Sequence, residues 1–224
     1  MLSHELRTPL TSILGWSTIL QEGAVDSETI EAAANSIKQA ATSQQYLVDE
    51  VLDLSRIVFA KFRIDRTPLD LILLVQSTAE LIRPMAEAKN VKLKTELPWR
   101  PCVIEGDGQR IKQVVWNFLT NAVKFTPSGG QVELRVEIVD SQVRVVVSDT
   151  GEGIDSQSLP HVFERFRQGA NGATKGGLGL GLSIARHVME AHHGSITALS
   201  DGLGRGATFI AGFPLTVERQ HATM

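Results

Sequence analysis

A histidine and a glutamate stand side by side near the start of the chain, and a threonine follows one helical turn later. These residues are His4, Glu5 and Thr8, in the stretch 3–10 (SHELRTPL). A neutral imidazole is a good nucleophile near neutral pH, and a neighbouring carboxylate can orient it and hold its proton. A lone His-Glu pair is more often a solvated pair of helix charges. A catalytic role therefore requires further functional residues elsewhere in the chain.

A second group of polar residues lies in the stretch 117–124 (NFLTNAVK). Asn117, Asn121 and Lys124 are four and three residues apart, so on a helix they share one face. Amide oxygens suit Mg²⁺, and a lysine suits a phosphate. This pattern is weak by itself, because asparagines on a helix are usually just solvated.

Two glycine-containing segments add further nucleotide-binding chemistry. In residues 149–154 (DTGEGI), the Asp149 carboxylate can accept a hydrogen bond from an exocyclic amine such as that of adenine. Its glycines allow close backbone approach, although a plain Asp-Gly turn explains this segment equally well in isolation. Residues 176–183 (GGLGLGLS) open a predicted helix, whose free amides and dipole favour phosphates. This segment is neither a Rossmann fingerprint nor a Walker loop, because its glycine spacing differs and no Gly-Lys-Ser/Thr ends it.

Together these segments resemble the catalytic core of sensor histidine kinases, and the resemblance covers nearly the whole chain. Residues 3–10 are similar to the H-box, in which the histidine accepts a phosphoryl group. Five segments resemble, in family order, the boxes of a GHKL-type ATP-binding domain. These are residues 117–124, 149–154, 163–166 (FERF), 176–183 and 206–209 (GATF).

The resemblance implies an enzyme that transfers the γ-phosphoryl group of Mg²⁺-bound ATP to His4 and then to an aspartate of a response-regulator receiver domain. We expect Glu5 to act as the general base. The resemblance further implies that Thr8 positions a water for phosphatase activity, that Asn117 and Asn121 hold Mg²⁺, and that residues 169–177 cover the nucleotide as a lid. The implied nucleotide-binding residues are Asn117, Asn121, Lys124, Asp149, Gly151, Gly153, Arg165, Lys175, Gly177, Gly179, Gly181 and Thr208.

Two other functions stay open at this point, a GHKL ATPase of the chaperone or topoisomerase type and a signalling scaffold that binds ATP without phosphotransfer. In hydrolytic relatives a glutamate typically lies four residues before the Mg²⁺-binding asparagine and activates water. Here that position is Asn117, which cannot act as a base, so a kinase is favoured. The scaffold ranks lower because all the expected polar residues are present.

Hydrophobic periodicity predicts two helices over residues 2–20 and 28–60. In the second helix, apolar side chains recur at a heptad spacing over more than four heptads. A two-helix hairpin cannot bury such a stripe alone, so we expect a four-helix bundle in a homodimer formed through residues 1–60. Packing of the stripe on the chain's own second domain is the alternative.

The remaining patterns predict helices over 69–89, 107–125 and 178–192, and strands over 91–97, 132–139, 143–148, 195–200 and 207–213. Helices on one side of a mixed, mostly antiparallel sheet make an α+β sandwich, here the Bergerat-type ATP-binding fold. We assign residues 1–62 to a dimerisation and histidine phosphotransfer hairpin, interpreted as truncated at its N-terminus. Residues 63–224 are assigned to a catalytic ATP-binding domain.

Composition limits the kinds of binding partner and the cellular compartment that we expect for the chain. The net charge of −3 gives no support for nucleic-acid binding, and no apolar run is long enough to span a membrane. The single Cys102 is expected to be a buried core thiol. These features predict a cytoplasmic fragment without membrane contact, and they leave open a membrane anchor in the full-length protein.

Aromatic and histidine residues outside the motifs have simple structural interpretations. Trp16, Trp99 and Trp116 are expected to be packing residues rather than a cofactor box. His192 and His193 end a predicted helix, where a cation favours the helix dipole.

Overall fold

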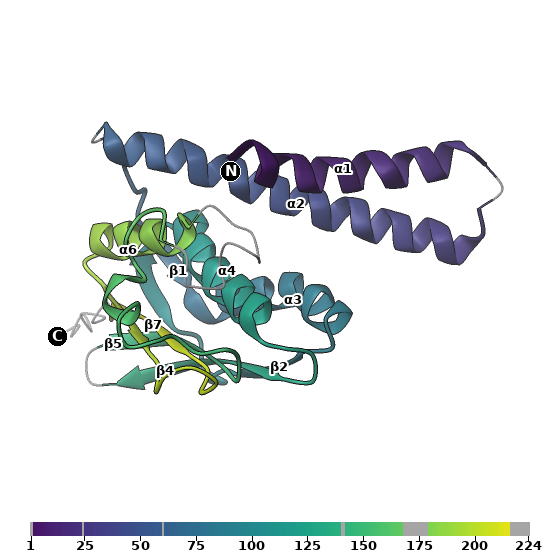
Figure 1. Cartoon of the computed structure of the whole chain (residues 1–224). Coiled ribbons are helices and arrows are strands. Elements are labelled where there is room, and N and C mark those ends of the chain that lie inside the picture. Colours follow the sequence, from purple (N-terminus) through teal and green to yellow (C-terminus); the bar gives the residue numbers. More distant parts are fainter. Residues whose placement is uncertain (1, 24, 60, 140–141, 168–178, 216–224) are drawn as a thin grey trace.

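The computed structural model of the chain describes residues 2–23, 25–59, 61–139, 142–167 and 179–215, with side chains from residue 6 onward. It begins with an antiparallel hairpin of two long helices, α1 (Leu2–Gln21) and α2 (Ser27–Val58), shown at the top of Figure 1. The Asp26 carboxylate starts α2 by accepting a hydrogen bond of 2.7 Å from the backbone N–H of Thr29. The predicted helix bounds are confirmed to within two residues.

The second part of the chain is an α+β unit in which α3, α4 and α6 cover one face of a sheet (Figure 1). The sheet has the strand order β2-β4-β5-β7-β6, with β2 and β4 parallel and the other neighbouring pairs antiparallel. The predicted fold class is therefore confirmed. The elements are β1 (Thr67–Asp70), α3 (Leu71–Ala88), β2 (Lys92–Glu96), β3 (Val103–Gly106), α4 (Gly108–Phe125), β4 (Gln131–Val139), β5 (Gln142–Asp149), a 3-10 turn (Leu159–His161), α6 (Gly181–Ala191), β6 (Ser195–Leu199) and β7 (Thr208–Pro214).

The sequence missed a separate two-stranded sheet formed by β1 and β3. Helix α3 also begins two residues later than predicted, because Asp70 ends β1 and caps the helix. The Asp70 carboxylate accepts hydrogen bonds from the backbone N–H groups of Ile72, at 2.9 Å, and Cys102, at 3.2 Å. One side chain thus starts α3 and ties it to the segment entering β3.

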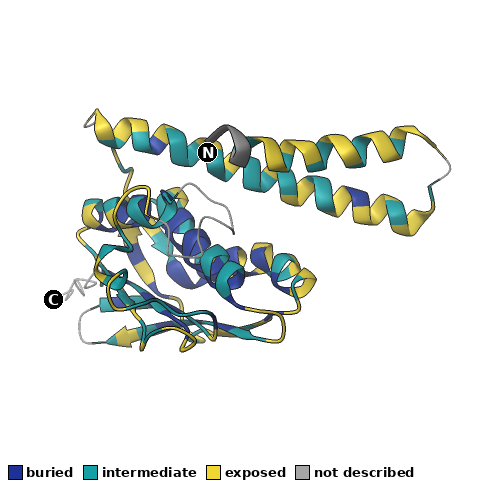
Figure 2. Cartoon of the chain, in the orientation of Figure 1, coloured by how far each residue is buried: buried dark blue, intermediate teal, exposed yellow. Residues whose placement is uncertain are grey.

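The hydrophobic core lies between the helices and the sheet, where Figure 2 shows the dark-blue buried residues. Helix α4 is its centre, with a nearly continuous run of buried side chains. It faces buried residues of the β4, β5 and β7 strands, and Cys102 is a buried free thiol, as predicted. The α4 side chains that are at most 1% exposed are Ile111, Val114, Val115, Phe118, Leu119, Ala122 and Val123.

His192 follows α6 as a buried neutral residue, so its interpretation as a helix-end cation is wrong. The backbone N–H of Asp107 donates to His192 Nε2 at 2.9 Å, so that nitrogen carries no proton. Nδ1 therefore holds the ring proton and donates to the Val188 carbonyl at 2.8 Å. Burial lowers the pKa of His192 below its ordinary value.

This histidine predicts acid-sensitive stability. Below the unfolded-state pKa of about 6.5, the unfolded chain binds a proton that the folded chain rejects. The contribution of His192 is therefore present above that pH and is lost as the pH falls, with a slope approaching about 1.4 kcal/mol per pH unit. Urea unfolding at pH 7.5, 6.5 and 5.5 measures this slope.

His192→Gln should flatten the pH profile of the unfolding free energy relative to the parent chain. His193→Gln is the matched control, because this neighbouring histidine is exposed and should leave the slope unchanged. The same slope in both variants would contradict the assignment.

Candidate active site

One face of α4 carries the three polar residues that the sequence singled out, Asn117, Asn121 and Lys124. Asn117 is only 5% exposed, and its side-chain Nδ2 donates to the Gly181 carbonyl at 2.9 Å. Asn121 and Lys124 are partly exposed, and the Lys124 ammonium lies 5.0 Å from the ring centroid of Phe125. The structure therefore joins this face of α4 to the first residue of α6.

Asp149 lies at the end of β5 with its carboxylate fixed by backbone amides. Its Oδ1 accepts hydrogen bonds from the N–H groups of Gly151, at 2.8 Å, and Ala207, at 3.3 Å. Desolvation by burial raises the pKa of Asp149 above its usual value, and these two bonds oppose the rise. Because the bonds within the described part of the chain use Oδ1, Oδ2 is left to accept a hydrogen bond from a ligand.

Thr208 lies beside Asp149 in the structure, at the start of β7. Its Oγ1 is 3.0 Å from Ser148 Oγ in the paired strand β5. The sequence prediction that these two distant segments contribute to one site is consistent with this pairing.

The glycines after Asp149 approach the chain's own backbone. Gly153 has a φ of +67°, and a Cβ added there would lie 2.1 Å from the Gly202 carbonyl oxygen. A Cβ added at Gly151 would lie 2.6 Å from the Phe125 carbonyl oxygen. These glycines let the loop pack against neighbouring segments, which is a sufficient structural reason for them.

The N-cap residue of helix α6, Leu180, forms no side-chain hydrogen bond with the helix. Gly179 before it has a φ of +65°. The carbonyl of Gly179 accepts a hydrogen bond of 2.9 Å from the Phe166 N–H, which ties α6 to the segment containing the exposed Arg165. Two predicted residues of this region, Lys175 and Gly177, lie outside the described residues.

The predicted acceptor motif forms the start of α1. His4 and Glu5 lie in its first turns, and Thr8 is exposed. The two helices of the hairpin run antiparallel, so positions equally far from the connecting turn lie opposite each other. His4 is 17 residues before Gln21, and Gln44 is 17 residues after Ser27, which puts the backbone of His4 at about the level of Gln44 on α2.

Helix α2 packs directly on α4 close to that level, so part of the hairpin packs on the chain's own second domain, the alternative that the sequence analysis gave. The rings of Tyr46 and Trp116 stack, with centroids 4.0 Å apart and an interplanar angle of 11°. Two helical turns further along α2, Asp53 is only 1% exposed. It forms an ion pair with Arg110 and accepts a hydrogen bond of 3.0 Å from Gln113 Nε2. Trp116 is thus a packing residue, as expected, and it packs between the two parts of the chain.

Glu50 lies on the same side of α2, between Tyr46 and Asp53. Burial and the neighbouring Asp53 charge raise the pKa of Glu50 to about 7, while the positive charge of Lys124 opposes the rise. A Cβ added at Gly181 would lie 2.9 Å from Glu50 Oε1, so the carboxylate lies against the start of α6. The spacing 46-50-53 is a helical stripe that periodicity could have flagged, but it lies beside the apolar stripe that dominates the sequence.

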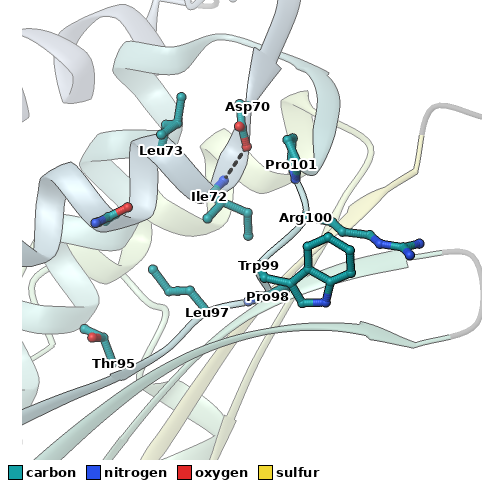
Figure 3. A pocket seen from close by; sticks show the side chains of 10 residues that line it. Asp70, Ile72, Leu73, Thr95, Leu97, Pro98, Trp99, Arg100 and Pro101 are labelled. Carbon is teal, nitrogen blue, oxygen red and sulfur yellow. Dashed lines mark hydrogen bonds between the residues drawn. The ribbon is translucent and has the colours of Figure 1, made fainter.

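A cleft of about 470 Å³ lies elsewhere, between the start of α3 and the loop before β3 (Figure 3). Its lining includes Leu73, Leu97 and Trp99. The indole of Trp99 is 84% exposed with the Arg100 guanidinium 4.4 Å from its ring, so its interpretation as a packing residue is wrong. This loop contains prolines at both ends and projects the ring outward. None of the predicted site residues lines this cleft.

The described residues contain neither a metal-binding group nor a membrane-spanning helix. They contain no group of three or more His, Cys, Asp or Glu side chains that could hold a metal ion. Within the same ranges, no helix is both long and apolar enough to cross a membrane.

Two family models match the sequence. The His Kinase A (phospho-acceptor) domain matches residues 1–58, and the histidine kinase-, DNA gyrase B- and HSP90-like ATPase matches residues 106–217, half of the chain. The chain therefore belongs to this ATPase family and is the catalytic core of a sensor histidine kinase.

Similar proteins include signalling kinases from distant organisms. Hybrid signal transduction histidine kinase D of Dictyostelium discoideum is 31% identical over 96% of this chain, and histidine protein kinase DivJ of Caulobacter vibrioides is 33% identical over 96%. The chain spans only 17% and 36% of the lengths of these two relatives.

Solved structures of similar proteins share the fold. Full-length ShkA in complex with AMPPNP has a TM-score of 0.68 and 30% identity over 96% of this chain and 45% of ShkA. The histidine kinase ThkA in complex with the response regulator TrrA has a TM-score of 0.62 and 25% identity over 97% of this chain and 61% of ThkA. ATP binding is thus the activity that the second unit shares with its family.

The fixed Asp149 carboxylate predicts a loss of nucleotide affinity in Asp149→Asn. Hydrogen bonds to a charged group contribute about 1.5–3 kcal/mol, so the dissociation constant of ATP should rise about ten- to a hundredfold. Isothermal titration calorimetry measures the change. Asp201→Asn removes the same charge at an exposed position and should bind ATP like the parent chain. Equal affinities in both variants would refute a direct role of Asp149.

Proposed function

We propose that this chain is a histidine kinase core that phosphorylates itself on His4 from Mg²⁺-bound ATP and passes the phosphoryl group to an aspartate of a response-regulator receiver domain. The observation that carries the proposal is the Tyr46–Trp116 stack. The stack holds α4, whose polar face is proposed to bind the nucleotide, against α2. The contact lies close to the level of the His4 backbone. An acceptor and a donor site therefore lie within one chain.

The chemistry follows from the residue types. A ring nitrogen of His4 attacks the γ-phosphorus of ATP, and the bond from that phosphorus to the β–γ bridging oxygen breaks, which releases ADP. Glu5 takes the imidazole proton as the general base. Asp149 accepts from the adenine amine, and Lys124 and Arg165 neutralise phosphate charge.

Asn117 and Asn121 are the residues that would hold Mg²⁺. Asn117 uses its Nδ2 to hold Gly181, so its Oδ1, the atom type that Mg²⁺ prefers, is free of that bond. A bound Mg²⁺ would offset the phosphate charge that develops during transfer.

A homodimer through residues 1–60 fits the surface of the hairpin. Large apolar side chains are exposed along both helices, and a four-helix bundle would bury them. We take residues 1–62 as the phosphotransfer unit, residues 63–224 as the catalytic unit, and the cytoplasm as their location, because ATP is available there. The exposed apolar residues of the hairpin are Leu10, Leu14, Ile19, Ile30, Val48, Leu52, Val58 and Phe59.

Incubation with γ-labelled ATP and Mg²⁺ should give an acid-labile, base-stable label on the chain, the stability expected of phosphohistidine. His4→Ala should abolish the label, because it removes the nucleophile while leaving the nucleotide site intact. His161→Ala, which removes a histidine of the second unit, should keep it. Label in His4→Ala would refute the assigned acceptor.

Glu5→Gln in the same assay tests the general base. It should slow labelling about a hundredfold, within the range of general-base catalysis, with unchanged ATP affinity. Full labelling rates in Glu5→Gln would remove Glu5 from the mechanism while keeping His4 as the acceptor.

Thr8→Ala should separate two activities. Thr8 lies one turn after His4 on α1, where its hydroxyl can orient a water toward the phosphorylated receiver aspartate. The variant should lose dephosphorylation of a phosphorylated receiver domain and keep labelling of His4. Thr11→Ala, three residues further along the helix and also exposed, should keep both. Equal loss of both activities in Thr8→Ala would count against the role.

A further inference from the structure

We propose that Glu50, on the helical hairpin, is a further residue of the nucleotide site, whose carboxylate opposes the triphosphate where α2 docks on the start of α6. This inference rests on the proposed ATP site. It adds that docking of the hairpin and binding of ATP phosphates disfavour each other.

The first observation is the position of Glu50 in the docked arrangement. Tyr46 on one side of it stacks on Trp116, and Asp53 on the other side pairs with Arg110, so α2 is held on α4 at both positions. These contacts keep the backbone of Glu50 at this position. Its Oε1 is 2.9 Å from where a Cβ on Gly181 would be.

The second observation is what else lies at this point. Asn117 Nδ2 is 3.2 Å from the same Cβ position and donates to the Gly181 carbonyl. The positive charge of Lys124, the cation proposed to bind the phosphates, also attracts the Glu50 carboxylate. The carboxylate therefore lies among the groups proposed to hold the triphosphate and its Mg²⁺.

The third observation is that a second carboxylate, Asp53, follows Glu50 by one turn of α2, so negative charge gathers where α2 docks. Burial and the Asp53 charge raise the pKa of Glu50 to about 7, and the positive charge of Lys124 opposes the rise. The charged Glu50 carboxylate is therefore unfavourable at this position, and a triphosphate would increase the repulsion.

Two consequences follow from charge and from linkage. Arrival of negatively charged phosphates near Gly181 should favour separation of α2 from α6, and separation should raise ATP affinity by the same factor. The docked arrangement is then one in which the catalytic unit is held at the hairpin with reduced affinity for ATP.

The test compares Glu50→Gln with its parent, both in a His4→Ala background so that no phosphoryl transfer consumes ATP. Calorimetric titrations at pH 8, where Glu50 is charged, use ATP, ADP and adenosine as probes. Because the opposing charge is lost, Glu50→Gln should bind ATP about tenfold more tightly. The gain should be smaller for ADP and absent for adenosine. Glu31→Gln removes one carboxylate from an exposed position of the same helix and should change none of the three affinities.

The outcomes separate this inference from the proposed function. Equal ATP affinities in Glu50→Gln and its parent, with ATP binding still weakened by Asp149→Asn, would overturn the role of Glu50 alone. An equal gain for ATP, ADP and adenosine would also overturn it, because altered packing rather than charge would then be the cause. Absence of ATP binding in the folded parent chain would refute the nucleotide site itself. Thermal unfolding of each variant verifies that it folds.

Discussion

Helix α4 packs against the sheet, α6 and α2 at the same time, and the arrangement of the whole chain depends on these three contacts. Its apolar side is buried against the sheet, Asn117 bonds to the start of α6, and Trp116 and Arg110 face α2. Burial fixes the rotation of α4 about its own axis, because a turn of the helix would place polar side chains in the core. The directions of its polar side chains are therefore set by its hydrophobic ones.

The contact between the hairpin and the catalytic unit contains a buried ion pair. Asp53 is buried and charged, with Arg110 and Gln113 at one oxygen. Its other oxygen accepts no hydrogen bond within the described structure and has Arg56 at 3.5 Å. A buried ion pair costs desolvation that its attraction only partly offsets, so such a contact contributes more to orientation than to stability. Apolar side chains of α2 accompany the stack and the ion pair, because Leu47, Val51, Leu54 and Ile57 pack against the core of the catalytic unit.

The outer surface of the hairpin carries large apolar side chains. Many of its apolar side chains are exposed in the single chain, whereas the catalytic unit encloses its own core (Figure 2). A core of that kind is complete without a partner, but an exposed apolar stripe on two helices is not. The catalytic unit thus depends on internal packing, whereas the hairpin leaves apolar surface that association with a partner would bury.

The sequence by itself determined the helix cap and the strands that depend only on residues nearby in the chain. Asp107 caps α4 at the predicted start of the helix over 107–125, because a carboxylate before a helix bonds to its free amides. Alternation of apolar residues located β4 and β5. Motif order also predicted Asp149 and Asn117 as site residues, and in the structure they form hydrogen bonds with Ala207 and Gly181, respectively. These predictions needed only neighbours within a few residues.

Only the tertiary structure decided the features that depend on residues far apart in the chain. The neutrality of His192 comes from its burial, and the backbone N–H that it accepts belongs to Asp107, 85 positions away. The short β1–β3 sheet comes from segments that carry weak strand patterns alone. The position of Glu50 beside Gly181 arises in the same way, because no periodicity says which face of α2 meets which end of α6. Local sequence fixes which side chains share a face, whereas the packing of helices against one another decides what that face meets.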